Sequence, residues 1–267
     1  MANRQNDGMT DGGAKHGYGW TPDLPDARDF AYSVPRPTMA ALGPKADLTA
    51  KCPPVYDQGQ LGSCTANAIG AAYQFDEMKQ KVANAFAPSR LFIYYNERVM
   101  EHSVASDAGA MIRDGIKSIG KQGVCPEPMW PYDIAKFAAK PPVACFQAAL
   151  SNRAVSYQRV PRDLSQMRGC LAEGYPWVFG ISVYDSFESA AASKTGTIPL
   201  PNTASENLLG GHAILAVGYD DAKRVFLFRN SWGTGWGKKG YGTIPYAYLL
   251  DGNLSDDFWT VRMVQGA

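Results

Sequence analysis

The hydrophobic pattern changes at Pro176, and this change limits the fold more than any other feature of the sequence. Before it, an alanine-rich stretch from Cys64 to about Lys81 predicts a long helix. Shorter helices are expected over residues 88–100, 107–121 and 161–173. After it, the strands are expected in five runs rich in Val, Ile and aromatic residues: WVFGISVY, HAILAVGYD, RVFLFRN, GYGTIPY and DFWTVRMV. A helical half followed by a strand-rich half predicts an α+β protein with a cleft between two lobes.

The composition excludes several classes of protein. Hydrophobic residues make up 45% of the 267 residues and charged residues 19%, which is enough to build a sizeable core and excludes wholesale disorder. The net charge of +1 gives no electrostatic case for a nucleic acid partner or an anionic membrane. No apolar run approaches the length of a spanning helix, and the N-terminus lacks the apolar core of a secretory signal. We therefore expect no membrane contact, and a location that is cytoplasmic or reached without a cleaved signal.

The N-terminal 43 residues differ in character from the rest. Residues 1–16 are polar and rich in glycine, and we expect them to be mobile. Residues 17–37 contain several prolines and four aromatic residues: Tyr18, Trp20, Phe30 and Tyr32. The prolines favour an extended chain, and the aromatic rings are costly to leave in water. The sequence therefore predicts that residues 17–37 are docked on the body of the protein.

Cysteine and histidine are scarce. Five cysteines are too few for a disulfide scaffold, and their odd number leaves at least one thiol without a partner within the chain. No CxxC or HxxxH spacing occurs, so we expect no structural metal site. The three histidines are His16, His102 and His212. His16 lies in the polar tail and His102 in a polar loop, which leaves His212 as the candidate for chemistry.

Cys64 stands at the predicted start of the long helix, behind a turn that contains Gly62 and Ser63. We expect Ser63 to cap the helix. The free backbone N–H groups and the helix dipole at this position favour the thiolate of Cys64. A lone cysteine is more often an inert packing group, and the position of Cys64 weakens that alternative without excluding it.

His212 and Asn230 are the candidates to act with this thiol. His212 follows Gly210 and Gly211 in a predicted strand, where two glycines let another backbone or a substrate approach closely. Taken alone, such a histidine is more often structural. Asn230 follows another predicted strand, and its amide oxygen can fix the tautomer of a histidine. Trp232 would cover that hydrogen bond and exclude water.

A glycine-rich run over residues 235–240 spells GxGxxG, the pattern of dinucleotide-binding loops. That fingerprint needs a helix after the loop, whose N-terminus holds the pyrophosphate. The residues that follow, Tyr241 to Tyr246, predict a strand. We therefore expect no nucleotide site in this run.

Three separated blocks closely resemble the papain-like cysteine peptidases, most of all their bacterial branch. The blocks are Gln58-Gly59 with Gly62-Ser63-Cys64, Gly211-His212-Ala213 through Val217-Gly218-Tyr219, and Asn230-Ser231-Trp232-Gly233-Thr234-Gly235-Trp236-Gly237. The resemblance runs from about residue 44 to the C-terminus. It implies the papain-like α+β fold, with a helical lobe over about 58–150, a β-barrel-like lobe over about 151–267 and the active-site cleft between them. Residues 1–43 would then be an extension to a peptidase domain over 44–267.

The resemblance also assigns roles. Cys64 would be the nucleophile, paired as a thiolate with protonated His212, and Asn230 would orient His212. Gln58 would donate to the oxyanion together with the Cys64 backbone N–H. The reaction would be hydrolysis of peptide bonds in a peptide or protein substrate through a thioester, without a metal or cofactor.

Substrate contacts follow from the same resemblance. Gly109 would pair its backbone with the substrate, and Ala110 and Met111 would line the second subsite. Gly180, Gly210, Gly211 and Trp232 would complete the substrate site. Asp256 is a candidate for the floor of the second subsite, where it would favour a basic side chain. A solvated turn aspartate is the stronger interpretation of that residue.

The sequence departs from the family at two positions beside the nucleophile. Thr65 replaces an aromatic residue, and Leu61 replaces a cysteine that normally forms a disulfide. Neither change removes a catalytic group. Cys52 and Cys125 both lie beside prolines in loop-like stretches and are candidates to pair with each other.

Two questions stay open at the level of sequence. We expect residues 1–43 to be too short and too rich in proline to form the long helical propeptide usual in the family, and residues 17–37 either restrain activity at the cleft or pad the outer face of a lobe. The alternatives to a peptidase are an acyltransferase with the same triad and a catalytically silent peptide-binding homologue. Intact Cys64, His212, Asn230 and Gln58 argue against a silent homologue.

Overall fold

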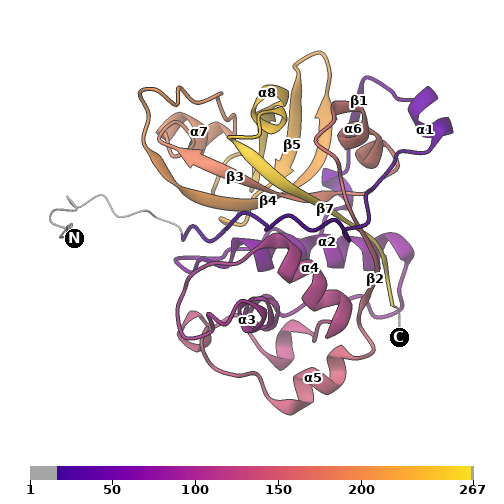
Figure 1. Ribbon diagram of the computed structural model, residues 1–267, viewed down its shortest axis with the longest axis vertical. Coiled ribbons are helices and arrows are strands. Elements are labelled where there is room, and N and C mark those ends of the chain that lie inside the picture. Colours follow the sequence, from indigo (N-terminus) through magenta and orange to yellow (C-terminus); the bar gives the residue numbers. More distant parts are fainter. Residues whose placement is uncertain (1–16, 266–267) are drawn as a thin grey trace, which may run out of the picture.

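The computed structural model describes residues 17–265, which form two lobes with a helix between them (Figure 1). One lobe is helical and contains α3 (Arg90–Met100), α4 (Ile112–Lys121) and α5 (Val143–Ala149), with short 3-10 helices at Glu127–Met129 and Ile134–Lys136. The other lobe is built on strands. The α+β architecture expected from the pattern change at Pro176 is confirmed.

The strands form one seven-stranded antiparallel sheet. Its order is β2-β7-β3-β4-β5-β6, and β1 pairs with β4 beside this path. The strands are β1 (Lys45–Asp47), β2 (Ala154–Arg159), β3 (Trp177–Tyr184), β4 (Leu208–Asp220), β5 (Val225–Arg229), β6 (Tyr241–Pro245) and β7 (Ser255–Val264). Four short α-helices, α1 (Arg36–Ala40), α6 (Leu164–Ala172), α7 (Ala190–Thr195) and α8 (Tyr246–Leu250), and the 3-10 helix Thr49–Lys51 complete the lobe. Because β1 precedes the helical lobe in the chain, the strand lobe draws on both ends of the sequence.

Helix α2 (Cys64–Gln80) lies where the two lobes meet (Figure 1). Most of its residues are buried, as expected of a helix that is covered on all sides. Ser63 stands at the N-cap position as predicted, but its side chain makes no capping hydrogen bond. The Ser63 hydroxyl is instead hydrogen-bonded to the Tyr132 hydroxyl and accepts a hydrogen bond from Asn67 Nδ2. The start of α2 is therefore fixed by contacts with the helical lobe.

Helix α4 begins five residues later than the sequence predicts. Residues 107–111 are not helical; instead the backbone of Ala110 pairs with the N-terminal segment. The later start leaves the peptide groups of residues 109–111 available at the edge of the helical lobe.

The N-terminal segment, residues 17–35, runs in an extended conformation between the lobes beside α2 (Figure 1, indigo). Trp20 and Tyr32 are buried and Tyr18 is half-buried, as the prediction of docking requires. Phe30 is 75% exposed, so the prediction is wrong for this ring. Its carbonyl instead accepts a hydrogen bond from Arg159 N, which leaves the side chain facing outward. Residues 1–16, including His16, lie outside the described residues.

All five cysteines are free thiols, so the predicted pairing of Cys52 with Cys125 is wrong. Cys52 donates to the carbonyl of Leu48. Cys125 lies buried in the helical lobe, within hydrogen-bonding reach of Cys145. Among the helices described, none combines the length and apolar character that crossing a membrane requires.

Candidate active site

The Cys64 sulfur is buried at the first residue of α2. Backbone N–H groups of Ala213, Gly19 and Thr65 donate to it and lower its pKa. Burial has the larger effect and raises the pKa of Cys64 to about 12. The backbone N–H groups favour the thiolate as expected, but burial outweighs them in this arrangement, in which Gly19 of the N-terminal segment covers the thiol.

His212 lies in β4, one residue before the Ala213 N–H that contacts the Cys64 sulfur. Its Nε2 is 2.8 Å from Asn230 Oδ1, and the same oxygen accepts from the Ser231 N–H at 2.8 Å. The Ser231 N–H can donate only to an acceptor, so the Asn230 atom that it contacts is the amide oxygen. His212 Nε2 therefore carries a proton and donates a hydrogen bond to this oxygen. Nδ1 is then the ring nitrogen that can take up or release a second proton.

Aromatic rings enclose the His212–Asn230 hydrogen bond. Trp232 stacks on the imidazole with the ring centres 4.7 Å apart and the planes at 25°. Phe187 and Tyr18 meet the imidazole edge-on at 6.3 Å. These rings exclude water from the bond and hold the imidazole in one orientation.

The Gln58 side chain is fixed at both ends. Its Nε2 donates to the carbonyl of Gly17 at 2.9 Å and to that of Leu61 at 3.0 Å. Its Oε1 accepts from the Ser231 hydroxyl at 2.6 Å. Sequence reasoning gave Ser231 no role. Its place between Asn230 and Trp232 in the chain is the signal that could have found it, because it couples the asparagine block to Gln58.

The turn before Cys64 is tied to residue 107 by hydrogen bonds, not by a disulfide. Both carboxylate oxygens of Asp107 accept from the Gly62 N–H, at 3.1 and 3.0 Å, and the Tyr94 hydroxyl donates to the same group. These bonds join the turn to the edge of the cleft where Leu61 replaces the family's cysteine.

The N-terminal segment pairs its backbone with both sides of the cleft. On one side Ala110 N donates to Gly19 O at 2.7 Å, and Thr21 N donates to Ala110 O at 3.1 Å. On the other side Gly211 O accepts from Gly19 N at 3.0 Å and from Trp20 N at 2.9 Å. The cleft thus binds an extended peptide through main-chain groups of β4 and of the loop before α4.

Glycine is required where the segment touches the cleft. A Cβ on Gly109, where φ is +74°, would lie 2.0 Å from Gly19 O, and one on Gly210 would lie 2.9 Å from the Tyr18 side chain. A Cβ on Gly180 would lie 1.9 Å from the Trp20 ring. The predicted substrate residues Gly109, Ala110, Gly180, Gly210, Gly211 and Trp232 therefore all lie against the segment. Met111 precedes α4 and donates its N–H to Glu101.

Asp256 does not form the floor of the second subsite, and the stronger interpretation of this residue as a solvated aspartate fits its position better. It pairs with Arg159 at 3.3 Å and with Arg162 at 3.1 Å, and its side chain is 44% exposed. The neighbouring Asp257 is buried and accepts the indole N–H of Trp20 at 3.1 Å.

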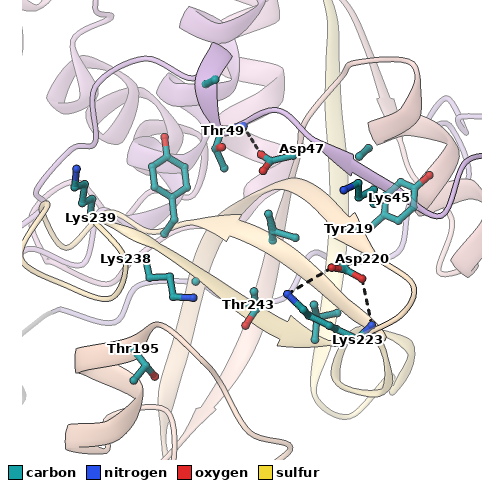
Figure 2. A pocket seen from close by; sticks show the side chains of 16 residues that line it. Lys45, Asp47, Thr49, Thr195, Tyr219, Asp220, Lys223, Lys238, Lys239 and Thr243 are labelled. Carbon is teal, nitrogen blue, oxygen red and sulfur yellow. Dashed lines mark hydrogen bonds and ion pairs between the residues drawn. The ribbon is translucent and has the colours of Figure 1, made fainter.

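A separate hollow of about 760 Å³ lies against β1, β4, β5 and β6 (Figure 2). Lysines and aspartates line much of it: Lys45, Asp47, Asp220, Lys223, Lys238 and Lys239. Figure 2 shows Lys223 bonded to Asp220 and Asp47 bonded to the Thr49 backbone. None of Cys64, His212, Asn230 and Gln58 lines this hollow. The glycine-rich run that ends at Gly240 leads into strand β6 and not into a helix, as expected.

Cys64 begins the helix between the lobes, His212 lies on the facing strand β4, and Asn230 holds His212 by a hydrogen bond. This is the arrangement of papain-like thiol proteases. The chain belongs to the papain family of cysteine proteases, whose family model matches residues 44–248. It is therefore a hydrolase of the cysteine protease class.

Two relatives resemble nearly the whole chain. Xylellain, a cysteine protease from Xylella fastidiosa, is 47% identical, with a TM-score of 0.86 over 95% of this chain and 97% of that one. An uncharacterized peptidase C1-like protein of Acanthamoeba polyphaga mimivirus is 40% identical over 92% of this chain and 87% of its own length. A procathepsin B from Trypanosoma congolense, 15% identical, shares the fold with a TM-score of 0.74 over 94% of this chain and 87% of that one. The predicted similarity to the bacterial branch of the family is confirmed by xylellain.

Proposed function

We propose that the chain hydrolyses peptide bonds with Cys64 as nucleophile and His212 as acid and base. His212 Nδ1 takes the thiol proton, and the sulfur attacks the substrate carbonyl carbon to form an S–C bond. The resulting imidazolium gives its proton to the leaving nitrogen as the C–N bond breaks. Water then attacks the thioester with His212 as base, which releases a carboxylic acid and restores the thiol.

The observation that carries this proposal is the carbonyl of Gly17, which accepts a hydrogen bond from Gln58 Nε2 beside the buried thiol. A peptide carbonyl in this position resembles the substrate oxygen that Gln58 would stabilise as it becomes negative. The Cys64 backbone N–H is the second donor we assign to that oxygen. Asn230 and the stacked Trp232 support His212 in the tautomer that the first proton transfer needs.

The test is turnover of fluorogenic dipeptidyl substrates under reducing conditions, compared with Cys64→Ala. We expect hydrolysis that is lost in Cys64→Ala. If added amines compete with water for the acyl group and dominate the products, the acyltransferase alternative holds. If no substrate turns over and Cys64 does not react with a peptidyl epoxide, the chain is a peptide-binding homologue.

We also propose that residues 1–43 form a regulatory extension, of which residues 17–37 close the active site of a peptidase domain over 44–267. The support is the segment's contact with the reacting groups: Gly19 N–H on the Cys64 sulfur, Gly17 O on Gln58 and Tyr18 against His212. A thiol with a pKa near 12 under this cover is not ionised at neutral pH. A chain that starts at residue 38 should turn over peptides faster than the full chain, and equal rates would contradict the proposal.

A further inference from the structure

The ring of Trp20 occupies a side-chain pocket formed by two glycines of neighbouring strands. Gly180 lies in β3 and Gly211 in β4, and a Cβ on either would lie within 3.0 Å of Trp20 ring atoms. Trp20 as a whole is only 9% exposed. The adjoining backbone makes the bonds to Ala110 and Gly211 described above. A substrate that uses the same main-chain groups places one of its side chains in this pocket.

The end of the pocket carries a carboxylate. Asp257 Oδ2 accepts the Trp20 indole N–H at 3.1 Å and the Asp23 backbone N–H at 2.7 Å. Its other oxygen, Oδ1, is bound by Arg159 at 2.9 Å. Both donors to Oδ2 belong to the N-terminal segment. When the segment leaves, Arg159 still holds Oδ1, and Oδ2 faces the pocket with neither of these donors.

The charges around Asp257 favour a neutral donor over a cation. Arg113 pairs with Asp29 of the segment at 2.5 Å, and its side chain is 6% exposed. Departure of the segment removes Asp29 and leaves the Arg113 guanidinium without that partner. Arg159 and Arg162 remain, paired with Asp256. Lysine or arginine from a substrate would therefore meet the guanidinium groups of Arg113 and Arg159, both of which act on Asp257.

We propose that Asp257 is a specificity-determining residue of the second subsite, selecting substrate side chains that are large and end in a neutral N–H or O–H donor, indole first. The pocket supplies the space for the ring, and Oδ2 supplies the acceptor. A buried acceptor left without a donor is costly, so a ring of equal size that lacks the N–H binds less well. This inference rests on the proposed peptidase function.

The matched variants are Asp257→Asn and Asp256→Asn. Because Arg159 donates to Oδ1 of Asp257, the carboxamide oxygen of the variant must face Arg159, and its NH₂ group then points into the pocket. The NH₂ group of the variant then faces the indole N–H, and because both groups are donors no hydrogen bond can form between them. Asparagine tolerates the left-handed backbone at this position, where φ is +61°. Asp256→Asn changes the neighbouring carboxylate, which faces Arg162.

The first experiment measures kcat/KM in the full chain carrying Gly19→Ala, in which the new Cβ would lie 1.7 Å from Gly62 O and prevent the segment from docking. Peptides carry tryptophan, 2-naphthylalanine or arginine at the second-subsite position. Tryptophan should exceed 2-naphthylalanine by about tenfold or more, and should also exceed arginine. Asp257→Asn should abolish the preference for tryptophan, and Asp256→Asn should keep it. Equal rates for tryptophan and 2-naphthylalanine, or a preference for arginine, would overturn the proposal.

The second experiment needs no turnover. It measures the rate at which a small epoxide alkylates Cys64 in the otherwise native full chain, which reports how often the segment opens. Trp20→Phe keeps a ring in the pocket and removes the N–H, so it should accelerate alkylation by about tenfold. The same change should have little effect in the Asp257→Asn background. Equal acceleration in both backgrounds would show that Asp257 does not distinguish a ring that carries an N–H donor from one that lacks it.

Together the two experiments separate the inference from the function on which it rests. Hydrolysis without discrimination, and without coupling between residues 20 and 257, overturns the inference and leaves the peptidase intact. Coupling in the alkylation rates with no hydrolysis of any peptide would keep Asp257 as the residue of the pocket that selects an N–H or O–H donor. It would overturn the proposed peptidase function.

Discussion

Ser231 shows how a residue outside the proposed catalytic set fixes one inside it. Its hydroxyl donates to Gln58 Oε1, and its backbone carbonyl accepts from the Gln58 N–H at 2.9 Å. With the amide oxygen engaged, the Gln58 NH₂ group has to point toward the cleft. Ser231 is therefore a positioning residue for the proposed oxyanion donor.

Gln58→Ala should lower kcat by about 100-fold, because it removes one of two donors to the developing oxyanion. Ser231→Ala should lower kcat by about three- to tenfold with little change in KM, because the amide stays but loses its orientation. Steady-state kinetics on one dipeptidyl substrate measures both. An unchanged kcat in Gln58→Ala would remove Gln58 from the mechanism.

The structure differs most from the expectations drawn from the sequence at contacts between residues that are far apart in the chain. Cys64, His212 and Asn230 were candidates from their local sequence context, and the resemblance of their blocks to the family added Gln58 and the proposed roles. The Trp20–Asp257 bond joins residues 237 positions apart, and no local pattern predicts it. Asp256, the weaker sequence candidate for the pocket, lies outside it because one position along a strand reverses the face on which a side chain lies.

Most elements were predictable because their patterns are local. Helix α2 and the strands β3 to β7 occur where the alanine-rich stretch and the apolar runs place them, whereas β2, which lies before Pro176, was not predicted. The short helices α5 and α7 were missed because they are too short for a clear repeat. Residues 107–111 were mistaken for the first turn of α4, because pairing with a distant segment overrides the local signal.

Helix α2 carries a buried acid at Asp76, whose two carboxylate oxygens have no hydrogen-bond partner. Burial raises the pKa of Asp76 to about 7, although Lys79 lowers it in part. A folded-state pKa above the unfolded value means that the folded state binds the extra proton. The stability from this group is complete below about pH 4 and is lost as pH rises through about 7.

Asp76→Asn should therefore increase the free energy of unfolding at pH 8 relative to the native chain, by about 2 kcal/mol, with a smaller effect at pH 5. Urea unfolding at the two pH values measures the difference. Asp133→Asn is the matched control, because Asp133 is exposed and asparagine can still cap the 3-10 helix at Ile134–Lys136. The same gain at both pH values would show that Asp76 is not protonated in the folded state.

At the scale of the whole molecule, the N-terminal segment is bound by Asp257, whose protonation depends on pH. Burial and the charge of the neighbouring Asp23 raise the pKa of Asp257 to about 7, against the opposing effects of the Asp23 backbone N–H and of Arg159. The burial, the Asp23 charge and the Asp23 N–H are all reduced or lost when the segment leaves, and burial has the largest effect of the three. The pKa of Asp257 is therefore higher with the segment docked, and protonation favours docking.

Docking should weaken as pH rises from about 5 to about 7 and level off above it. The measurement is the alkylation rate of Cys64 in the full chain, divided by that of Gly19→Ala to remove the ionisation of the thiol itself. This ratio should rise with pH by up to about tenfold per unit, and Asp257→Asn should flatten it. A ratio that rises toward acid pH would mean that release is driven by other groups.

The central claim is that one chain builds the cysteine protease site and closes it with its own segment. A shorter chain tests this less cleanly, because the segment contributes Trp20, Tyr32 and Val34 to the core. Gly19→Ala disturbs the contact alone, and Gly43→Ala is its control in the same extension, where the nearest atom to a new Cβ is 3.9 Å away. The decisive measurement is the rate at which a peptidyl epoxide alkylates Cys64 in these two variants and in the native chain. We expect Gly19→Ala to react at least about tenfold faster than the native chain and Gly43→Ala to match it; equal rates in all three would contradict the account.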